Sequence, residues 1–257
     1  MIFTGIVLAA TVVGLTGLDF SLSQSCQNAA AAVLVGPAGT CLGVSGLVNI
    51  ATTPANQSII TPVDNWLTAT CAQPACTNSI LEAAFNNITT GCQSDLNATG
   101  IDSQTAAAYV SGFEEWYPVG REVACLKDTN ANNALCVTST LKAFETYLGV
   151  PLSLQSIDLL TAKLATSTEV PKTLICTPCI QASYALIRPH LKDADRGTVD
   201  SVLSSNCGSN FTDGTTPASI KQSAATSNTN AAVSSLAVWS SATSLLVGVA
   251  GVVALAL

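Results

Sequence analysis

Apolar side chains recur at steps of three and four residues along much of this chain, which is the spacing of one face of an α-helix. The clearest case lies between Leu174 and Leu191, where the apolar positions are spaced by four, three and four residues: Ile180, Tyr184, Ile187 and Leu191. Thr177 is a favourable N-cap for this segment, and Pro178 suits the first helical position because the N–H that it lacks would be unpaired there. We therefore predict a helix that begins here and buries its apolar face against other parts of the chain.

A stripe of the same spacing follows three cysteines of the chain, namely Cys76, Cys136 and Cys179. Counted from each cysteine, the stripe occupies offsets one, five, eight and twelve. Any amphipathic helix can show this spacing, so we interpret the three segments as core-facing helices with a cysteine near each start. An internal repeat is the alternative interpretation.

Turn residues and caps divide the rest of the chain into further short helices. We expect these at about residues 29–35, 61–70, 76–90, 102–117, 136–148, 153–164 and 198–204, whereas helix and loop are both open for residues 41–50. Pro118 and Gly120 are expected to end the fourth of these helices, and Trp66 is expected to lie in the core. Strict alternation of apolar and polar residues, which is typical of strands, is nearly absent. The pattern predicts an all-α fold of about seven or eight short helices.

A short apolar segment from Ile6 to Leu15 lies near the start of the chain. It is too short for a comfortable membrane span and has the length of the apolar part of a secretory signal peptide. We expect a signal peptide within residues 1–25, with cleavage between residues 17 and 25, because Gly17 and the serines that follow it are small. An uncleaved anchor is the alternative, since no Lys or Arg precedes the apolar segment.

The other end of the chain has the order of features found in a signal for attachment of a glycosylphosphatidylinositol (GPI) lipid. Residues 212–235 are rich in Ser, Thr and Asn and predict a stalk, and residues 236–257 form an apolar tail. The small residues that follow Asn230 make it the best attachment residue, with Asn228 as runner-up. A retained transmembrane helix is the alternative, although no Lys or Arg follows to hold it. The expected partner is the outer leaflet of the plasma membrane, reached through the lipid, with cell-wall glucan as a further candidate.

Ten cysteines lie between the two terminal apolar segments: Cys26, Cys41, Cys71, Cys76, Cys92, Cys125, Cys136, Cys176, Cys179 and Cys207. An even number of cysteines in a secreted chain predicts disulfides, here five, that staple one domain over residues 26–211. The connectivity stays open, although the polar loop between Cys125 and Cys136 would suit a locally closed disulfide. Cys176 and Cys179 form a C-x-x-C pair, which is either a redox motif or two structural half-cystines with other partners. No metal site is expected, because one histidine and no second C-x-x-C accompany them.

Charge is sparse in this sequence. Charged residues make up 10% of the chain, the formal net charge is −7, and no two basic residues are adjacent. Binding to nucleic acid needs clustered positive charge that neutralises phosphates, so we expect no nucleic-acid partner. Four Asn-x-Ser/Thr sequons predict N-glycosylation in a secretory context: Asn56, Asn87, Asn97 and Asn210.

Residue patterns typical of catalysis are few. His190 is the only histidine, so any Ser–His or Cys–His hydrolase would have to use it. The segment from Gly43 to Gly46 falls one residue short of the G-x-S-x-G turn of serine hydrolases. Glu114 and Glu115 are adjacent and point about 100° apart on a helix, so we interpret them as a solvated face. We expect a non-catalytic protein without a cofactor and keep a hydrolase that uses His190 as a minor alternative.

The order of the cysteines resembles that of a known group of proteins. The residues that show the resemblance are Cys71 with Cys76, the segment Cys125-Leu126-Lys127-Asp128 with Cys136, the pair Cys176 and Cys179, and Asn206-Cys207-Gly208. Over about residues 26–211 the chain resembles an uncharacterised group of fungal secreted, GPI-anchored, cysteine-rich proteins. It does not match hydrophobins, which have adjacent cysteines. The resemblance implies a fungal cell-surface or cell-wall protein of unknown activity and carries over no site residues. A structural or interaction role is therefore the leading functional hypothesis, and an extracellular module that binds a lipid or other apolar ligand is the alternative.

Overall fold

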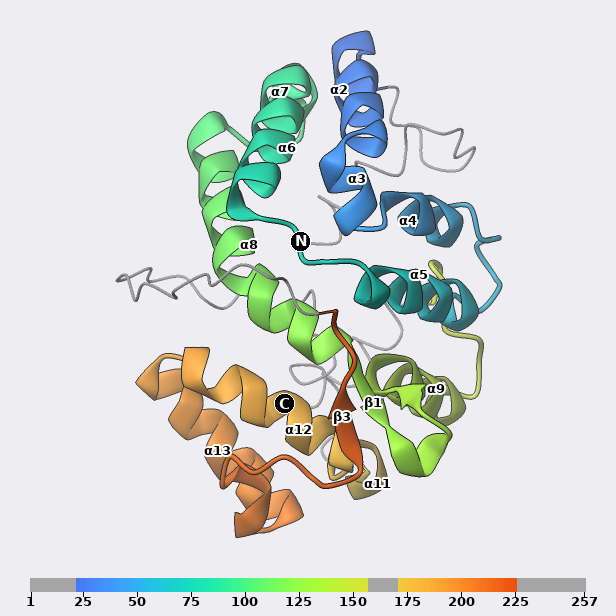
Figure 1. The fold of residues 1–257 in the computed structure, drawn as a ribbon, viewed down its shortest axis with the longest axis vertical. Helices are drawn as coiled ribbons and strands as arrows, with labels where there is room; N and C mark the ends of the chain where they lie inside the picture. The colour runs from blue at the N-terminus through green and yellow to red at the C-terminus, as the bar shows by residue number, and fades with distance from the viewer. Residues whose placement is uncertain (1–21, 157–170, 226–257) are drawn as a thin grey trace.

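The computed structural model describes residues 22–156 and 171–225 of the chain. Within them, eleven α-helices and three short 3₁₀ helices surround one small sheet of three strands (Figure 1). Most of the described residues are helical and five disulfides join the helices, which confirms the predicted disulfide-stapled all-α class. The small sheet was not expected, because its strands are only two or three residues long and carry too little alternation to recognise.

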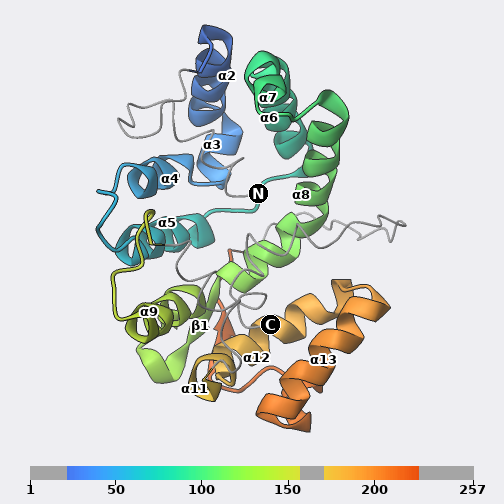
Figure 2. The same cartoon turned by 180° about the vertical axis from the view of Figure 1, so that it is seen from behind.

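The first half of the chain contains six helices. They are α2 (Gln24–Val35), α3 (Pro37–Cys41), α4 (Val44–Ala51), α5 (Ile60–Ala72), α6 (Asn78–Gly91) and α7 (Gln93–Ala98). α2 packs along α6 at one end of the molecule, whereas α4 and α5 lie side by side nearer the middle (Figures 1 and 2). The stretch 41–50, which the sequence left open, is therefore mostly helix. Thr77 caps α6 as its hydroxyl accepts a hydrogen bond from the Ile80 N–H.

The long helix α8 (Ser103–Ala124) connects the two halves of the molecule (Figure 1). The prediction that Pro118 and Gly120 end this helix is wrong, because α8 continues for six residues beyond the proline. A proline inside a helix removes one backbone hydrogen bond and costs about 3 kcal/mol. Burial beyond the proline offsets that cost, since Val119 and Val123 are each 3% exposed and pack against Ile187 of another helix.

The second half of the chain contains the sheet and the remaining helices. These are β1 (Leu126–Asp128), η2 (Thr129–Ala131), β2 (Ala134–Leu135), α9 (Cys136–Leu148), α11 (Lys172–Ile175), α12 (Pro178–Ile187), η3 (Arg188–His190), α13 (Asp193–Cys207), η4 (Ser209–Thr212) and β3 (Ile220–Gln222). β1 lies in the middle of the sheet and pairs antiparallel with both β2 and β3. The helix predicted to follow Ser153 falls mostly outside the described residues. α13 begins at Asp193, five residues before the predicted start, since Asp193 and Asp195 favour its first turn.

Helix α12 is the central element of this second half and contacts α8, α9 and β1. Three of the four positions of its predicted stripe are buried, with Ile180 and Tyr184 each 1% exposed and Ile187 4% exposed, whereas Leu191 lies beyond the end of η3 and is half-buried. The predicted start is confirmed as well. Thr177 caps the helix by accepting a hydrogen bond from the Ile180 N–H, and Pro178 occupies the first helical position.

The folded domain extends beyond its predicted end at residue 211. Residues 212–225, expected to begin the stalk, instead fold back and add β3 to the sheet. The side chain of Ile220 explains why the chain folds back onto the sheet, because Ile220 is 4% exposed and packs with Leu126 and Cys179. One apolar residue in a polar stretch is a weak signal in a sequence. Residues 226–235, the rest of the expected stalk, lie outside the described residues.

Candidate functional site

All ten cysteines form disulfides in the structure, and none is free. The pairs are Cys26–Cys92, Cys41–Cys76, Cys71–Cys125, Cys136–Cys179 and Cys176–Cys207, with Cα atoms 4.1 to 5.6 Å apart. The first three pairs lie within residues 26–125 and the last two within residues 136–207. The bridges therefore close two separate blocks of the chain, which no disulfide joins; packing and hydrogen bonds such as that from the Thr138 hydroxyl to Asp64 hold them together.

The C-x-x-C pair is structural in this fold. Cys176 bonds to Cys207 on α13 and Cys179 bonds to Cys136 on α9, so neither half-cystine is available as a redox dithiol. The prediction that Cys125 and Cys136 suit a local disulfide is wrong. Cys125 caps the end of α8 and bonds to Cys71 of α5, whereas Cys136 begins α9, so the two thiols face different helices.

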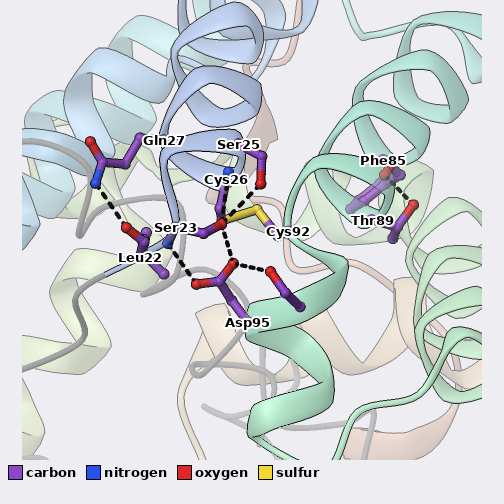
Figure 3. The surroundings of a disulfide bond; sticks show 10 residues. Leu22, Ser23, Ser25, Cys26, Gln27, Phe85, Thr89, Cys92 and Asp95 are labelled. Atoms are coloured by element: carbon purple, nitrogen blue, oxygen red, sulfur yellow. Dashed lines mark hydrogen bonds between the residues drawn. A yellow bond between two sulfur atoms is a disulfide. The ribbon is translucent and has the colours of Figure 1, made fainter.

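A polar cluster fixes the first described residues to α7 (Figure 3). The Ser23 N–H and hydroxyl donate to the two carboxylate oxygens of Asp95 at 2.8 and 2.6 Å. These bonds hold the pKa of Asp95 below its usual value, since they stabilise the ionised form. Leu22, only 7% exposed, packs beside the Cys26–Cys92 disulfide. The residues just before Cys26 thus belong to the folded domain.

His190 is exposed at the end of η3, and its ring lies 6.1 Å from that of Trp116. It forms no hydrogen bond with any residue in the described ranges, so the structure brings no serine, cysteine or carboxylate into bonding distance of it. Glu115 is exposed as expected. Glu114 departs from expectation, because one of its oxygens is buried without a partner among the described residues. Burial, and secondarily the charge of Glu82, raise the pKa of Glu114.

A second polar cluster joins α12, η3 and α13. The Tyr184 hydroxyl donates to Asp200 Oδ1 at 2.6 Å, and the Arg188 guanidinium donates to both Asp200 oxygens at 2.9 and 2.8 Å. The hydrogen bond from Arg188 is the main cause of the lowered pKa of Asp200. Burial, together with the bond to Asp200, raises the pKa of Tyr184. Sequence reasoning found Tyr184 as a core residue and missed this network, because Asp200 lies on a different helix.

An open hollow lies between α4 and α5. Its volume is about 440 Å³, and it is lined by Gly43, Ser45, Gly46, Asn49, Thr61, Pro62, Asn65, Trp66 and Ala69. Trp66 is half-buried at its wall and donates from Nε1 to the Leu42 carbonyl at 2.9 Å. Two glycines allow this close approach: a Cβ on Gly46 would stand 2.7 Å from Trp66 Cδ1, and Gly43 has a φ of +61°. Trp66 therefore lies half-buried at an open surface and belongs to none of the buried apolar clusters of the described residues, so it is not the core residue that the sequence predicted.

A second hollow of about 350 Å³ continues the first toward α3. It is lined by Leu34, Gly39, Thr40, Gly43, Ser45, Ala69 and Gln73, three of which also line the first hollow. We call the two together the α4–α5 groove. Its α5 wall runs from Thr61 to Gln73, about 18 Å at 1.5 Å per residue. No charged residue lines either hollow, and both are open and mixed in polarity.

The four predicted glycosylation residues are all exposed: Asn56, Asn87, Asn97 and Asn210. Asn87 is exposed even though it lies in the last turns of α6. Exposure is compatible with an attached glycan, and glycosylation itself stays a prediction. Asn56 lies in the loop that joins α4 to α5, so it is close in sequence to the residues that line the groove.

Two further findings bear on identity. Within the described residues, no helix has the length and apolar character required to cross a membrane. The predicted attachment residue Asn230 and the two terminal apolar segments fall outside those residues. Comparisons of the chain with protein-family models, with curated proteins and with solved structures give no match.

Proposed function

We propose that this chain is a secreted, non-catalytic cell-surface protein with a structural or interaction role. The observation that carries the proposal is the pairing of every cysteine in five disulfides. Disulfides persist in oxidising compartments and are rare in the cytosol, so the bridges indicate an extracellular or secreted protein.

The geometry favours display and binding over catalysis. His190 lies at the surface without a hydrogen-bonded Ser, Cys or carboxylate in the described ranges. Catalytic dyads and triads need such a bond to activate the nucleophile. The alternative role in binding a lipid requires a mainly apolar cavity that encloses the ligand, and the α4–α5 groove is open and mixed in polarity.

The finer parts of the proposal rest on the sequence. A GPI lipid at Asn230 would attach the chain to the outer leaflet of the plasma membrane, and transfer to cell-wall glucan would attach it to the wall. The cysteine pattern supports a fungal source, because it resembles that of fungal GPI-anchored proteins of unknown activity. The residues between Ala225 and Asn230 would then connect the folded domain to its anchor.

Mass spectrometry of the C-terminal peptide of the mature surface protein tests the anchor. We expect a peptide that ends at Asn230 and carries a glycolipid, and we expect release from membranes by phosphatidylinositol-specific phospholipase C. Replacing Asn228 and Asn230 together by Leu should abolish attachment, because a small residue is needed there. Replacing Ser223 by Ala, outside the attachment region, is the control. Recovery of an intact Leu257 end from the mature surface protein would contradict the GPI proposal.

A further inference from the structure

We propose that the α4–α5 groove binds a neutral oligosaccharide chain. The inference gives the proposed interaction role a ligand class and in that sense rests on the proposed function. Its support is the chemistry of the groove, which offers amide and hydroxyl groups along both walls and one aromatic residue between them.

The polar side chains of the groove are available for a ligand. Asn49 extends from α4, Asn65 extends from α5, and Gln73 directly follows the end of α5. All three are exposed, and within the described ranges no residue forms a hydrogen bond with their side-chain amides. Each amide offers two donors and one acceptor in a plane, so it can serve two neighbouring hydroxyls of one sugar ring. Ser45 and Thr61 add hydroxyls that can donate or accept.

Trp66 supplies the aromatic surface that sugar rings use. A sugar ring presents C–H groups on its faces and hydroxyls around its rim, so a partly exposed tryptophan beside amides matches both parts. The hydrogen bond to the Leu42 carbonyl and the contact with Gly43 and Gly46 hold the indole in place. A side chain fixed in this way loses little conformational freedom when a ligand arrives.

The lining favours a neutral ligand. No lining residue is charged, so the groove offers no side-chain charge to a phosphate, a carboxylate or a cationic ligand. A lipid chain would need an enclosed apolar wall, and this groove is open and carries exposed amides. A neutral, hydroxyl-rich chain fits this lining best, and the wall of the groove, about 18 Å long at 1.5 Å per residue, accommodates several sugar units in a row.

The sugar chain has two conceivable sources. One is an external glycan, and the other is the protein's own N-glycan on Asn56, which stands in the loop between the two helices that form the groove. The same side chains would hold either, so the chemistry is shared and the experiment must separate the sources.

The test is calorimetric titration of the full-length chain, produced in a eukaryotic secretory host, as wild type and as Asn56→Gln. The probes are hexasaccharides of glucose with β-1,3, β-1,4 and α-1,4 linkages, of N-acetylglucosamine and of mannose, with hexagalacturonate as the charged control. We expect at least one neutral hexasaccharide to bind and hexagalacturonate not to bind. Binding by both forms identifies an external ligand, whereas binding by Asn56→Gln alone identifies the Asn56 glycan as the resident occupant.

Two pairs of variants place the binding in the groove. Asn49→Ala combined with Asn65→Ala should weaken binding by about tenfold, since each removes a hydrogen bond to the sugar. Asn86→Ala, another exposed asparagine on α6, is its control. Ala69→Glu puts a bulky charge where the two hollows meet and should abolish binding, whereas Thr68→Glu, exposed on the same helix outside the groove, should leave it unchanged. All five positions are exposed, so the fold should persist, which circular dichroism verifies.

Absence of binding by every neutral probe in both forms would overturn the proposal, as would binding that Ala69→Glu leaves intact. Either result would leave the anchored display of the protein untouched, because the mass of the C-terminal peptide tests that separately. Conversely, an intact Leu257 end would remove the GPI anchor and leave a positive titration standing.

Discussion

Asp200 links α13 to α12 and η3 by hydrogen bonds. Its carboxylate accepts a hydrogen bond from the hydroxyl of Tyr184, a residue that is 1% exposed. It also accepts hydrogen bonds from Nε and Nη2 of Arg188. Asp200→Ala should lower the free energy of unfolding by about 1–3 kcal/mol, because it leaves the buried Tyr184 hydroxyl without an acceptor. Urea denaturation measures the change, with Glu115→Ala, at an exposed carboxylate of α8, as control. An unchanged midpoint would show that water replaces the carboxylate.

The same carboxylate predicts a pH dependence of stability. The pKa of Asp200 is lowered in the folded state, chiefly by the hydrogen bond from Arg188, and the pKa of Asp95 is lowered by Ser23. Both contributions to stability are therefore fully present above the unfolded pKa of about 3.9 and are lost as pH falls through the lower folded values. We expect the melting temperature to fall below about pH 4, and to fall less steeply in Asp200→Asn.

The contacts of Ser23 predict where the mature chain begins. Leu22 is buried beside the Cys26–Cys92 disulfide, and Ser23 both caps α2 and bonds to Asp95. Cleavage within the predicted window should therefore fall before Leu22, because removal of these residues would uncover the disulfide and uncap the helix. Mass spectrometry of the N-terminal peptide measures the position. A mature protein that starts at Gln24 or later would contradict the expectation.

At the scale of elements, Thr177 caps the N-terminus of α12. Its hydroxyl accepts the Ile180 N–H, one of the donors that the first turn of a helix leaves unpaired. Thr177→Ala should cost about 0.5–2 kcal/mol of folding free energy, and Thr77→Ala should cost about the same at α6. Thr198→Ala, inside α13, serves as control, since alanine is the better helix former there. Equal stability of Thr177→Ala and the control in chemical denaturation would show that the cap contributes nothing.

The elements show which parts of the fold a sequence can predict. Caps and apolar spacing lie within a few residues of one another, so the start of α12 and its buried stripe could be read directly. Pro118 misled the prediction because a local rule was outweighed by burial of Val119 and Val123 against another helix. The strand β3 was missed for the same kind of reason, since its pairing partner β1 lies about ninety residues earlier in the chain. Contacts between residues far apart in the chain determine both the length of α8 and the position of β3, and no local sequence pattern indicates such contacts.

At the scale of the whole molecule, the two disulfide blocks give a definite peptide map. Digestion without reduction should yield Cys176 linked to Cys207 and Cys179 linked to Cys136. Replacing Cys176 and Cys207 by Ser should cost about 2–5 kcal/mol, and thiol titration of the denatured wild type should find no free thiol. A peptide with Cys176 bonded to Cys179 would contradict the pairing and restore the redox interpretation.

The α4–α5 groove also lies beyond what the sequence could predict. The positions of Trp66 and Asn65 on α5 follow from helical spacing, but their place opposite Gly46 and Asn49 depends on how two helices pack. The sequence did contain one signal, the pair of glycines at residues 43 and 46. Such a pair fits close approach of another element, yet it does not say which element approaches.

The return of the chain at β3 has a mechanical consequence. The Ser223 and Ala225 N–H groups donate to the Cys125 and Cys71 carbonyls, so the described chain leaves the fold beside the Cys71–Cys125 bridge. A pull on the chain beyond Ala225 would first load these two hydrogen bonds and then the backbone pairing of β3 with β1. Peeling would then stop at Cys207, which is covalently bonded to Cys176. The released segment is roughly 18 residues, or about 60 Å when extended. A protein tethered at this end could lengthen under load by that length less the distance that the segment already spans in the fold, while its covalently closed blocks stay intact.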